Sequence, residues 1–200
     1  RLSAVAPRQD VGYAFKVIRN DETVNAFALP GGHMYVYTGL MRLCEDEAEL
    51  AAVMAHEIAH VAEHHHGEMI TRMYGYEFLM ALVMGENPGA YARLAADLAG
   101  SLGAMYYSRD NEREADRLGM AILVAAGYNP EAMLSFMEKM LAEDRRRGGG
   151  GLAIFSSHPP TEERLALLRS LAAQYPPATR QGRRYGERYR VNALGRLGGS

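Results

Sequence analysis

The sequence predicts an α+β protein that is mostly helical and has a small antiparallel sheet near its N-terminus. Short segments rich in β-branched and aromatic residues lie before residue 40, whereas apolar residues recur at helical spacing from residue 46 onward. The chain has 200 residues, 48% of them hydrophobic, which is enough for one sizeable core. We therefore expect a single domain over residues 1–175, followed by an arginine-rich tail over residues 176–200 that is a docking strand or a linker.

The expected sheet is built from residues 11–18, 23–29 and 34–38, with Pro30-Gly31-Gly32 as the turn between the last two strands. The first helix is expected over about residues 46–65, because Asp46 and Glu49 stand where an N-cap and its N3 partner belong. The other expected elements are two helices within 69–107 around a loop at 85–89, helices over about 110–126, 130–143 and 161–173, with Asn129 and Thr161 as caps, and a mobile loop at 145–151.

Charge and cysteine content exclude several classes of partner and site. A formal net charge of −2 provides no strong field for phosphates, so nucleic acid is not an expected partner. Cys44 is the only cysteine, which excludes an intramolecular disulfide and a cage of thiolate ligands, and we expect it to be a small buried hydrophobe. The longest uninterrupted apolar run, residues 78–84, is shorter than the roughly 20 residues that a membrane-spanning helix needs, so we expect no such segment here.

The segment His56-Glu57-Ile58-Ala59-His60 carries the strongest chemical signal. On a helix, His56 and His60 lie one turn apart on the same face, so both imidazoles can reach one metal ion. Glu57 lies about 100° around the helix from His56, which suits a general base acting on zinc-bound water rather than a ligand.

A catalytic zinc usually has three protein ligands, so a third must come from elsewhere in the chain. Glu112 is the leading candidate, and Asp116 lies one turn further along the same predicted helix face. Asp116 would accept the free ring N–H of a metal-bound histidine and so fix its orientation. An ordinary salt-bridged helix is the alternative for this segment, because Arg109, Arg113 and Arg117 are close in sequence.

Two imidazoles and one carboxylate leave one net positive charge on Zn²⁺, which favours hydrolysis of an amide. The reaction also needs donors for the developing oxyanion, and His158 and Arg164 are placed to supply them at the start of the last helix. His64, His65 and His66 follow the first helix, and we expect them to form its solvated end, with His64 as the less favoured third ligand.

Four separated segments resemble the zinc metallopeptidase family that contains the CAAX prenyl protease, HtpX and the periplasmic proteases BepA and LoiP. They are residues 25–32 (NAFALPGG), 56–60 (HEIAH) and 112–116 (EREAD), and His158-Pro159 followed by Arg164. The resemblance covers about residues 11–172. It implies a thermolysin-like gluzincin core, one zinc ion per chain and an extended peptide substrate.

Further expectations come from this resemblance alone. The segment Asn25, Ala26, Phe27 and Ala28 is similar to an active-site edge strand that pairs with substrate through backbone hydrogen bonds. Zinc aminopeptidases have a Gly-Ala-Met-Glu-Asn segment upstream, which this chain lacks, so an endopeptidase is favoured. His158 resembles a residue that occupies the open zinc position in a latent state. Residues 69–107 are too interrupted to span a membrane, which points to the periplasmic or cell-envelope branch.

These observations lead to two hypotheses. The first is a zinc endopeptidase that hydrolyses unfolded or misassembled proteins, because capture by an edge strand requires an extended chain. The second is a cell-envelope chaperone or assembly factor in which zinc is structural and His158 suppresses peptidase activity. The oligomeric state, the natural substrate and the cleavage preference are not determined by the sequence.

Overall fold

A three-stranded sheet near the N-terminus and a larger set of helices make up the structure, a computed structural model that describes residues 1–76, 78, 80, 89, 92, 106–149 and 152–197. The strands are β1 (Ala14–Ile18), β2 (Ala26–Leu29) and β3 (His33–Tyr37), in the spatial order β1-β3-β2. The expectation of a mostly helical α+β protein with a small N-terminal sheet is confirmed.

The sheet is mixed, so the expectation of a purely antiparallel sheet was wrong. β2 and β3 form the expected antiparallel hairpin, with Phe27 opposite Tyr35, but β1 runs parallel to β3. After β1 the chain crosses to the opposite edge of the sheet, where it forms β2. It then turns back, and β3 lies between β1 and β2. Strand direction is set by this long-range insertion, which the composition of each strand does not encode.

The turn between β2 and β3 is formed as expected. Gly31 and Gly32 both have φ of 85°, a backbone conformation that residues with a Cβ rarely adopt. At Gly32, an added Cβ would also lie 2.4 Å from the side chain of Val11. The glycines therefore allow the tight return of β3 beside β1.

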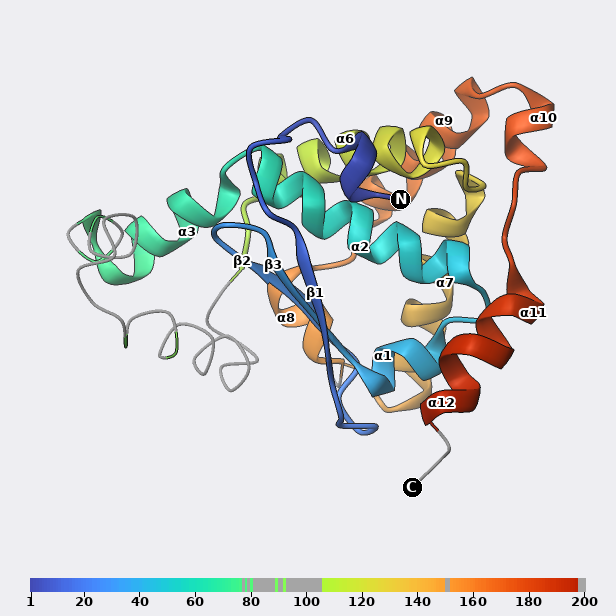
Figure 1. Cartoon of the computed structure of the whole chain (residues 1–200), viewed down its shortest axis with the longest axis horizontal. Helices are drawn as coiled ribbons and strands as arrows, with labels where there is room; N and C mark the ends of the chain where they lie inside the picture. Colours follow the sequence, from blue (N-terminus) through green and yellow to red (C-terminus); the bar gives the residue numbers. More distant parts are fainter. Residues whose placement is uncertain are drawn as a thin grey trace.

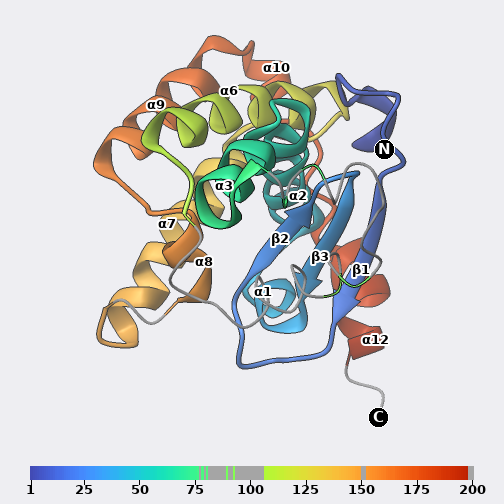
Figure 2. The ribbon, with the colours of Figure 1, turned by 90° about the vertical axis from the view of Figure 1, so that its left-hand side faces the viewer.

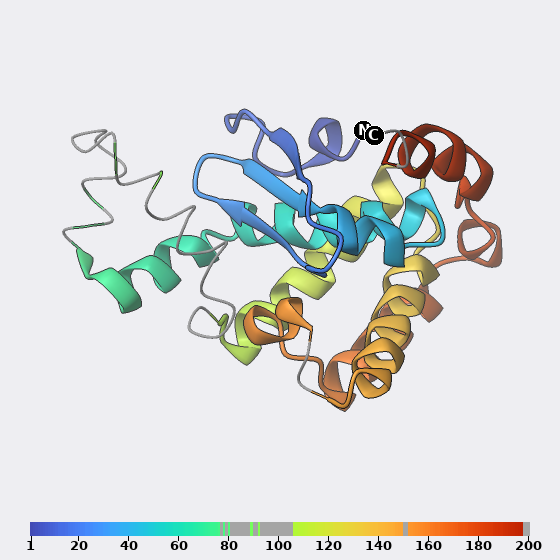
Figure 3. The ribbon, with the colours of Figure 1, turned by 90° about the horizontal axis from the view of Figure 1, so that it is seen from below.

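Helix α2 (Glu47–Ala62) is the centre of the fold, and nearly all of its residues are buried. The predicted N-cap is confirmed, because the Asp46 side chain accepts the backbone N–H of Glu49 at 3.0 Å. α2 contacts β2 on one side and α6 (Arg109–Ala125) and α7 (Glu131–Arg146) on the other. Figures 1 and 3 show α2 between the sheet and these helices.

The first helix ends earlier than expected, because His64 adopts a left-handed conformation with φ of 60°. The chain then turns into a separate helix, α3 (His65–Tyr74). The expected pair of helices within 69–107 lies for the most part outside the described residues. α7 continues to Arg146, past the expected end near Glu143, and the expected mobile loop at 145–151 thus begins within this helix.

Thr161 caps α9 (Glu162–Gln174) as predicted, by accepting the backbone N–H of Arg164 at 3.1 Å. α9 packs on α6 and α7, and Figure 2 shows this helical layer on the opposite side of α2 from the sheet. The other described helices before the C-terminal tail are η1 (Ser3–Val5), α1 (Thr38–Leu43) and α8 (Ala153–Ser157). No helix among the described residues has both the length and the apolar character for a membrane crossing.

The described part of the arginine-rich tail forms four short helical segments, the second of which packs against α2. They are α10 (Pro177–Arg180), α11 (Gly186–Tyr189), η2 (Arg190–Leu194) and α12 (Gly195–Leu197). Tyr189 is buried, and its hydroxyl donates to the backbone oxygen of Met41 at 2.7 Å. In the same region, Arg184 pairs with Asp46 at 2.5 Å.

Candidate metal and catalytic centre

A close approach of α6 to α2 brings the predicted site residues together. Gly119 of α6 faces the backbone of α2, where an added Cβ would lie 3.1 Å from both Cα and N of His56. Asp116 and Glu112 precede Gly119 by one and two turns on the same buried face of α6. Because Gly119 has no side chain, α6 lies close enough to α2 for Glu112 and Asp116 to reach the histidines of α2.

Four buried side chains from three parts of the chain converge within 4.8 Å of one another: His56, His60, Glu112 and His158. The Nε2 atoms of His56 and His60 are 3.1 Å apart. Glu112 Oε1 lies 3.4 Å from His60 Nε2, and Glu112 Oε2 lies 3.5 Å from His56 Nε2. The predicted convergence of two distant helices on one point is therefore present.

The spacing of these donor atoms fits a bound metal ion. Around a tetrahedral ion with bonds of about 2.0–2.1 Å, neighbouring ligand atoms lie about 3.3 Å apart, and the ring nitrogens and Glu112 oxygens are 3.1–3.5 Å apart. The buried charges also favour a metal ion. Three buried carboxylates belong to the site, Glu57, Glu112 and Asp116, together with one buried guanidinium, that of Arg164. A divalent cation would compensate this negative charge.

Asp116 and Arg164 hold the ligand groups from behind. Asp116 Oδ1 lies 3.1 Å from His56 Nδ1, which leaves Nε2 of His56 directed at the cluster, and the predicted support of a metal-bound histidine by Asp116 stays a prediction. Arg164 binds both oxygens of Asp116 at 2.8 Å and also contacts Glu112 Oε2 at 2.6 Å. Its guanidinium thus orients two carboxylates in this state, and the predicted contact of Arg164 with an oxyanion stays a prediction.

Charges in the cluster shift several pKa values. Burial acts to lower the pKa of His56, but Asp116 and Glu112 raise it to about 9. Burial likewise opposes ionisation of Glu112, yet His158 and Arg164 hold its pKa well below the usual range. For His60, burial dominates and lowers the pKa well below that of a free imidazole. The field that favours a proton on His56 equally favours a metal cation at its ring.

Glu57 and His158 lie against each other at the edge of the cluster. His158 Nε2 is 3.3 Å from Glu57 Oε1, and His158 Nδ1 is 2.8 Å from Glu112 Oε1. Burial raises the pKa of Glu57, while His158, His56 and the backbone of Ala28 act in the opposite direction. Glu57 Oε2 is buried and has no hydrogen-bond partner among the described residues, so one oxygen is left to accept a proton.

The expected substrate strand lies beside this centre. Asn25, Ala26, Phe27 and Ala28 are all buried, and β2 is an edge strand that pairs with β3 alone among the described strands. Just before β2, the backbone oxygen of Val24 accepts the N–H of Ile154 at 3.2 Å. Asn25 Oδ1 accepts the backbone N–H of Ala26 at 2.9 Å.

Three residues near the centre were missed by the sequence reasoning. His65 and His66 are each only 2% exposed, so the expected solvated helix end was wrong for both, whereas His64 is exposed as expected. Tyr107 stacks on the ring of His60 at a centroid distance of 3.8 Å. The left-handed turn at His64 starts α3 beside the end of α2, so that His65 and His66 lie against the ring of His60. Only the recurrence of histidine five residues after His60 gave any signal.

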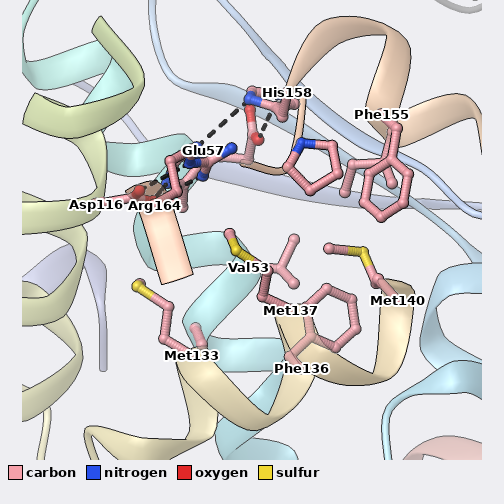
Figure 4. A pocket seen from close by; sticks show the side chains of 14 residues that line it. Val53, Glu57, Asp116, Met133, Phe136, Met137, Met140, Phe155, His158 and Arg164 are labelled. Atoms are coloured by element: carbon pink, nitrogen blue, oxygen red, sulfur yellow. Dashed lines mark hydrogen bonds and ion pairs between the residues drawn. The ribbon is translucent and has the colours of Figure 1, made fainter. Parts of the chain in front are cut away.

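A pocket opens beside Glu57 and His158. Figure 4 shows the polar side chains Glu57, His158, Asp116 and Arg164 at one end and methionine and phenylalanine side chains at the other. The apolar wall is formed by Val53 of α2, Phe155 of α8 and one face of α7, namely Met133, Phe136, Met137 and Met140. An apolar side chain placed there would lie next to Glu57 and His158.

Comparisons with known proteins agree with this site. Residues 1–172 match Peptidase family M48. The chain is 37% identical over 189 residues to the putative beta-barrel assembly-enhancing protease of Vibrio cholerae and 35% identical over 186 residues to the beta-barrel assembly-enhancing protease of Escherichia coli, in each case over 88% of this chain and 38% of the relative. It is 34% identical over 173 residues to the mitochondrial metalloendopeptidase OMA1 of Schizosaccharomyces pombe, over 82% of this chain and 48% of the relative.

The chain spans less than half the length of these curated relatives. Two of them are named as proteases for beta-barrel assembly, and the third is named as a metalloendopeptidase. The family match extends over most of the chain, including all the residues of the cluster. The chain therefore belongs to peptidase family M48, a family of metalloendopeptidases.

Proposed function

We propose that this chain is the peptidase domain of a zinc-dependent endopeptidase. The observation that carries the proposal is the convergence of His56, His60 and Glu112 around one point, with the buried carboxylate of Glu57 beside it. The family implies a metal cofactor. Two imidazoles and one carboxylate are a usual ligand set of catalytic zinc.

Zinc held by these residues would polarise the substrate carbonyl and acidify the attacking water. Glu57 then acts as the general base, because its Oε2 is buried without a partner among the described residues. Burial raises the pKa of Glu57, which makes the carboxylate a better proton acceptor than an exposed glutamate. The proton that it takes passes to the leaving amine.

The substrate is proposed to be an extended polypeptide. Among the described strands β2 lies at the edge of the sheet, and those of its backbone groups that do not pair with β3 recognise a strand of any sequence once the Asn25 side chain releases the N–H of Ala26. The pocket lined by α7 receives an apolar side chain of that strand. Unfolded or misassembled proteins expose both features at once, which supports them as the substrate class.

His158 is proposed to hold the resting enzyme in a latent state. Its Nδ1 lies 3.4 Å from His56 Nε2 and 2.8 Å from Glu112 Oε1, a position suited to a fourth ligand. Its Nε2 faces Glu57, so the general base is engaged as well. When substrate enters, His158 moves away and donates to the oxyanion, and Arg164 is the second proposed donor there.

A second candidate function follows from the same contacts. With His158 retained in the cluster, the domain would act as a chaperone or assembly factor with structural zinc and suppressed peptidase activity. Two relatives are named for beta-barrel assembly, which supports a bacterial periplasmic or cell-envelope location for either function.

Casein cleavage by the zinc-loaded wild type and by Glu57→Gln tests the first function. We expect Glu57→Gln to reduce the rate by about 10²–10⁴, because a positioned general base contributes about that much. Zinc content and thermal melting of the variant serve as controls, since Gln has nearly the same shape. Equal activity of the two proteins would remove Glu57 as the base. Absence of cleavage by both, with zinc bound, would favour the second function.

A further inference from the structure

His65 lies directly behind His60, on the side away from the metal-binding cluster. The Nδ1 atoms of the two rings are 3.0 Å apart, and both side chains are almost completely buried. The other ring nitrogen of His65, Nε2, is 3.1 Å from Oε2 of Glu114 on α6. A continuous line of contacts thus runs from Glu114 through His65 to His60.

The chemistry of these groups sets the direction of every hydrogen bond in the line. An ionised Glu114 can only accept, so Nε2 of His65 carries the hydrogen. In the neutral ring of His65, Nδ1 is then a bare acceptor, and the hydrogen of the contact at 3.0 Å belongs to Nδ1 of His60. Nε2 of His60 is left with its lone pair directed at His56 and Glu112. That is the tautomer that binds a metal.

The second histidine of α2 has a comparable arrangement. Asp116 lies 3.1 Å from Nδ1 of His56 and fixes that ring directly. Glu114 precedes Asp116 by two residues on α6, so its side chain leaves the helix from another face and reaches His65 instead of His60. His65 spans the additional distance and contacts His60 at the edge of its ring, while Tyr107 stacks on a face of that ring at a centroid distance of 3.8 Å.

We propose that His65, supported by Glu114, is a positioning residue that fixes the tautomer and orientation of His60 for zinc binding. This inference rests on the proposed zinc function. The carboxylate polarises His65, and His65 in turn accepts from His60, which makes Nε2 of His60 a better donor to the metal. His65 contacts neither substrate nor metal and acts through His60 alone.

Zinc affinity of the purified chain, measured by competition with a chromogenic chelator, tests the proposal. We expect His65→Phe to weaken zinc binding about 10–100-fold, the usual cost of losing such a partner of a metal-bound histidine. His65→Gln retains a side-chain oxygen that can accept from His60 Nδ1, so it should recover part of the loss. Glu114→Gln, at a side chain 58% exposed, should weaken binding in the same direction by less.

His66→Phe is the matched control, because His66 is equally buried and follows His65 in the chain, while its ring packs against that of His60 at a centroid distance of 6.3 Å without contacting Nδ1 of His60. It should leave zinc affinity unchanged. If His65→Phe does not fold, the partly exposed Glu114→Gln still decides the question together with His65→Gln. Wild-type affinity in every folded variant at positions 65 and 114 would overturn the proposal, whereas absence of zinc binding by the wild type would instead overturn the proposed function.

Discussion

Helix α2 has a buried polar cluster at each end, and the two clusters differ in how far their hydrogen-bonding groups are satisfied. At the N-terminal end, Glu49 is fully buried and its oxygens accept from Ser135, Lys139, Arg184 and the backbone N–H of Glu45. At the C-terminal end, Glu57 retains an oxygen without a partner in the part of the chain that the structure describes, and the Nε2 atoms of His56 and His60 are 3.1 Å apart.

The difference distinguishes a cluster that stabilises the fold from one that binds a ligand. Buried charges are tolerated when each is paired and hydrogen-bonded, as Glu49 is with Lys139 and Arg184. A buried carboxylate oxygen that has no partner among the described residues is unfavourable unless something else occupies the space beside it. We therefore expect substitutions at the C-terminal cluster to change zinc binding and those at the N-terminal cluster to change stability.

The largest effect is expected from Glu112→Gln, which removes a proposed ligand from the C-terminal cluster. Zinc affinity should fall by more than about 100-fold, because losing even an outer partner of a ligand costs 10–100-fold. The metal-free variant should melt within a few degrees of the metal-free wild type, since Arg164 retains Asp116. Chelator competition and calorimetry check both points. Undiminished zinc binding would contradict the assignment of the C-terminal cluster as the zinc site.

An intermediate effect is expected from Arg184→Ala in the N-terminal cluster. This change removes a partner of both Asp46 and Glu49, but the arginine side chain is 33% exposed, so we expect a loss of about 1–3 kcal/mol in the free energy of unfolding. Urea denaturation measures it. Zinc affinity of the folded protein should not change. Arg146→Ala, which removes an exposed pair with Glu143, is the control and should have no measurable effect.

The smallest effect is expected from His158→Ala, which tests whether one member of the C-terminal cluster can leave it. If His158 occupies the fourth position at rest, its removal should tighten binding of a small hydroxamate to the zinc-loaded protein. The expected factor is the inverse of the fraction of wild-type molecules in which His158 is away from the zinc. Inhibitor binding separates this effect from any loss of oxyanion stabilisation. An unchanged hydroxamate affinity would argue that the resting site is already open.

Local spacing made much of the fold and of the proposed site predictable. The N-caps Asp46 and Thr161, the turn at Gly31-Gly32 and the shared face of His56 and His60 all depend on residues within about one helical turn or a tight turn. Glu112 and Asp116 could be selected because carboxylates four residues apart share a helix face and suit the ligand chemistry.

The remaining features depended on contacts between segments far apart in the sequence. The parallel direction of β1, the burial of His65 and the pairing of Arg164 with Asp116 each require elements that the chain brings together only on folding. The sequence by itself determined which side chains share a helix face and which chemistry they offer. Tertiary structure alone decided which of them meet, because the close approach at Gly119 and the left-handed turn at His64 set the distances between elements.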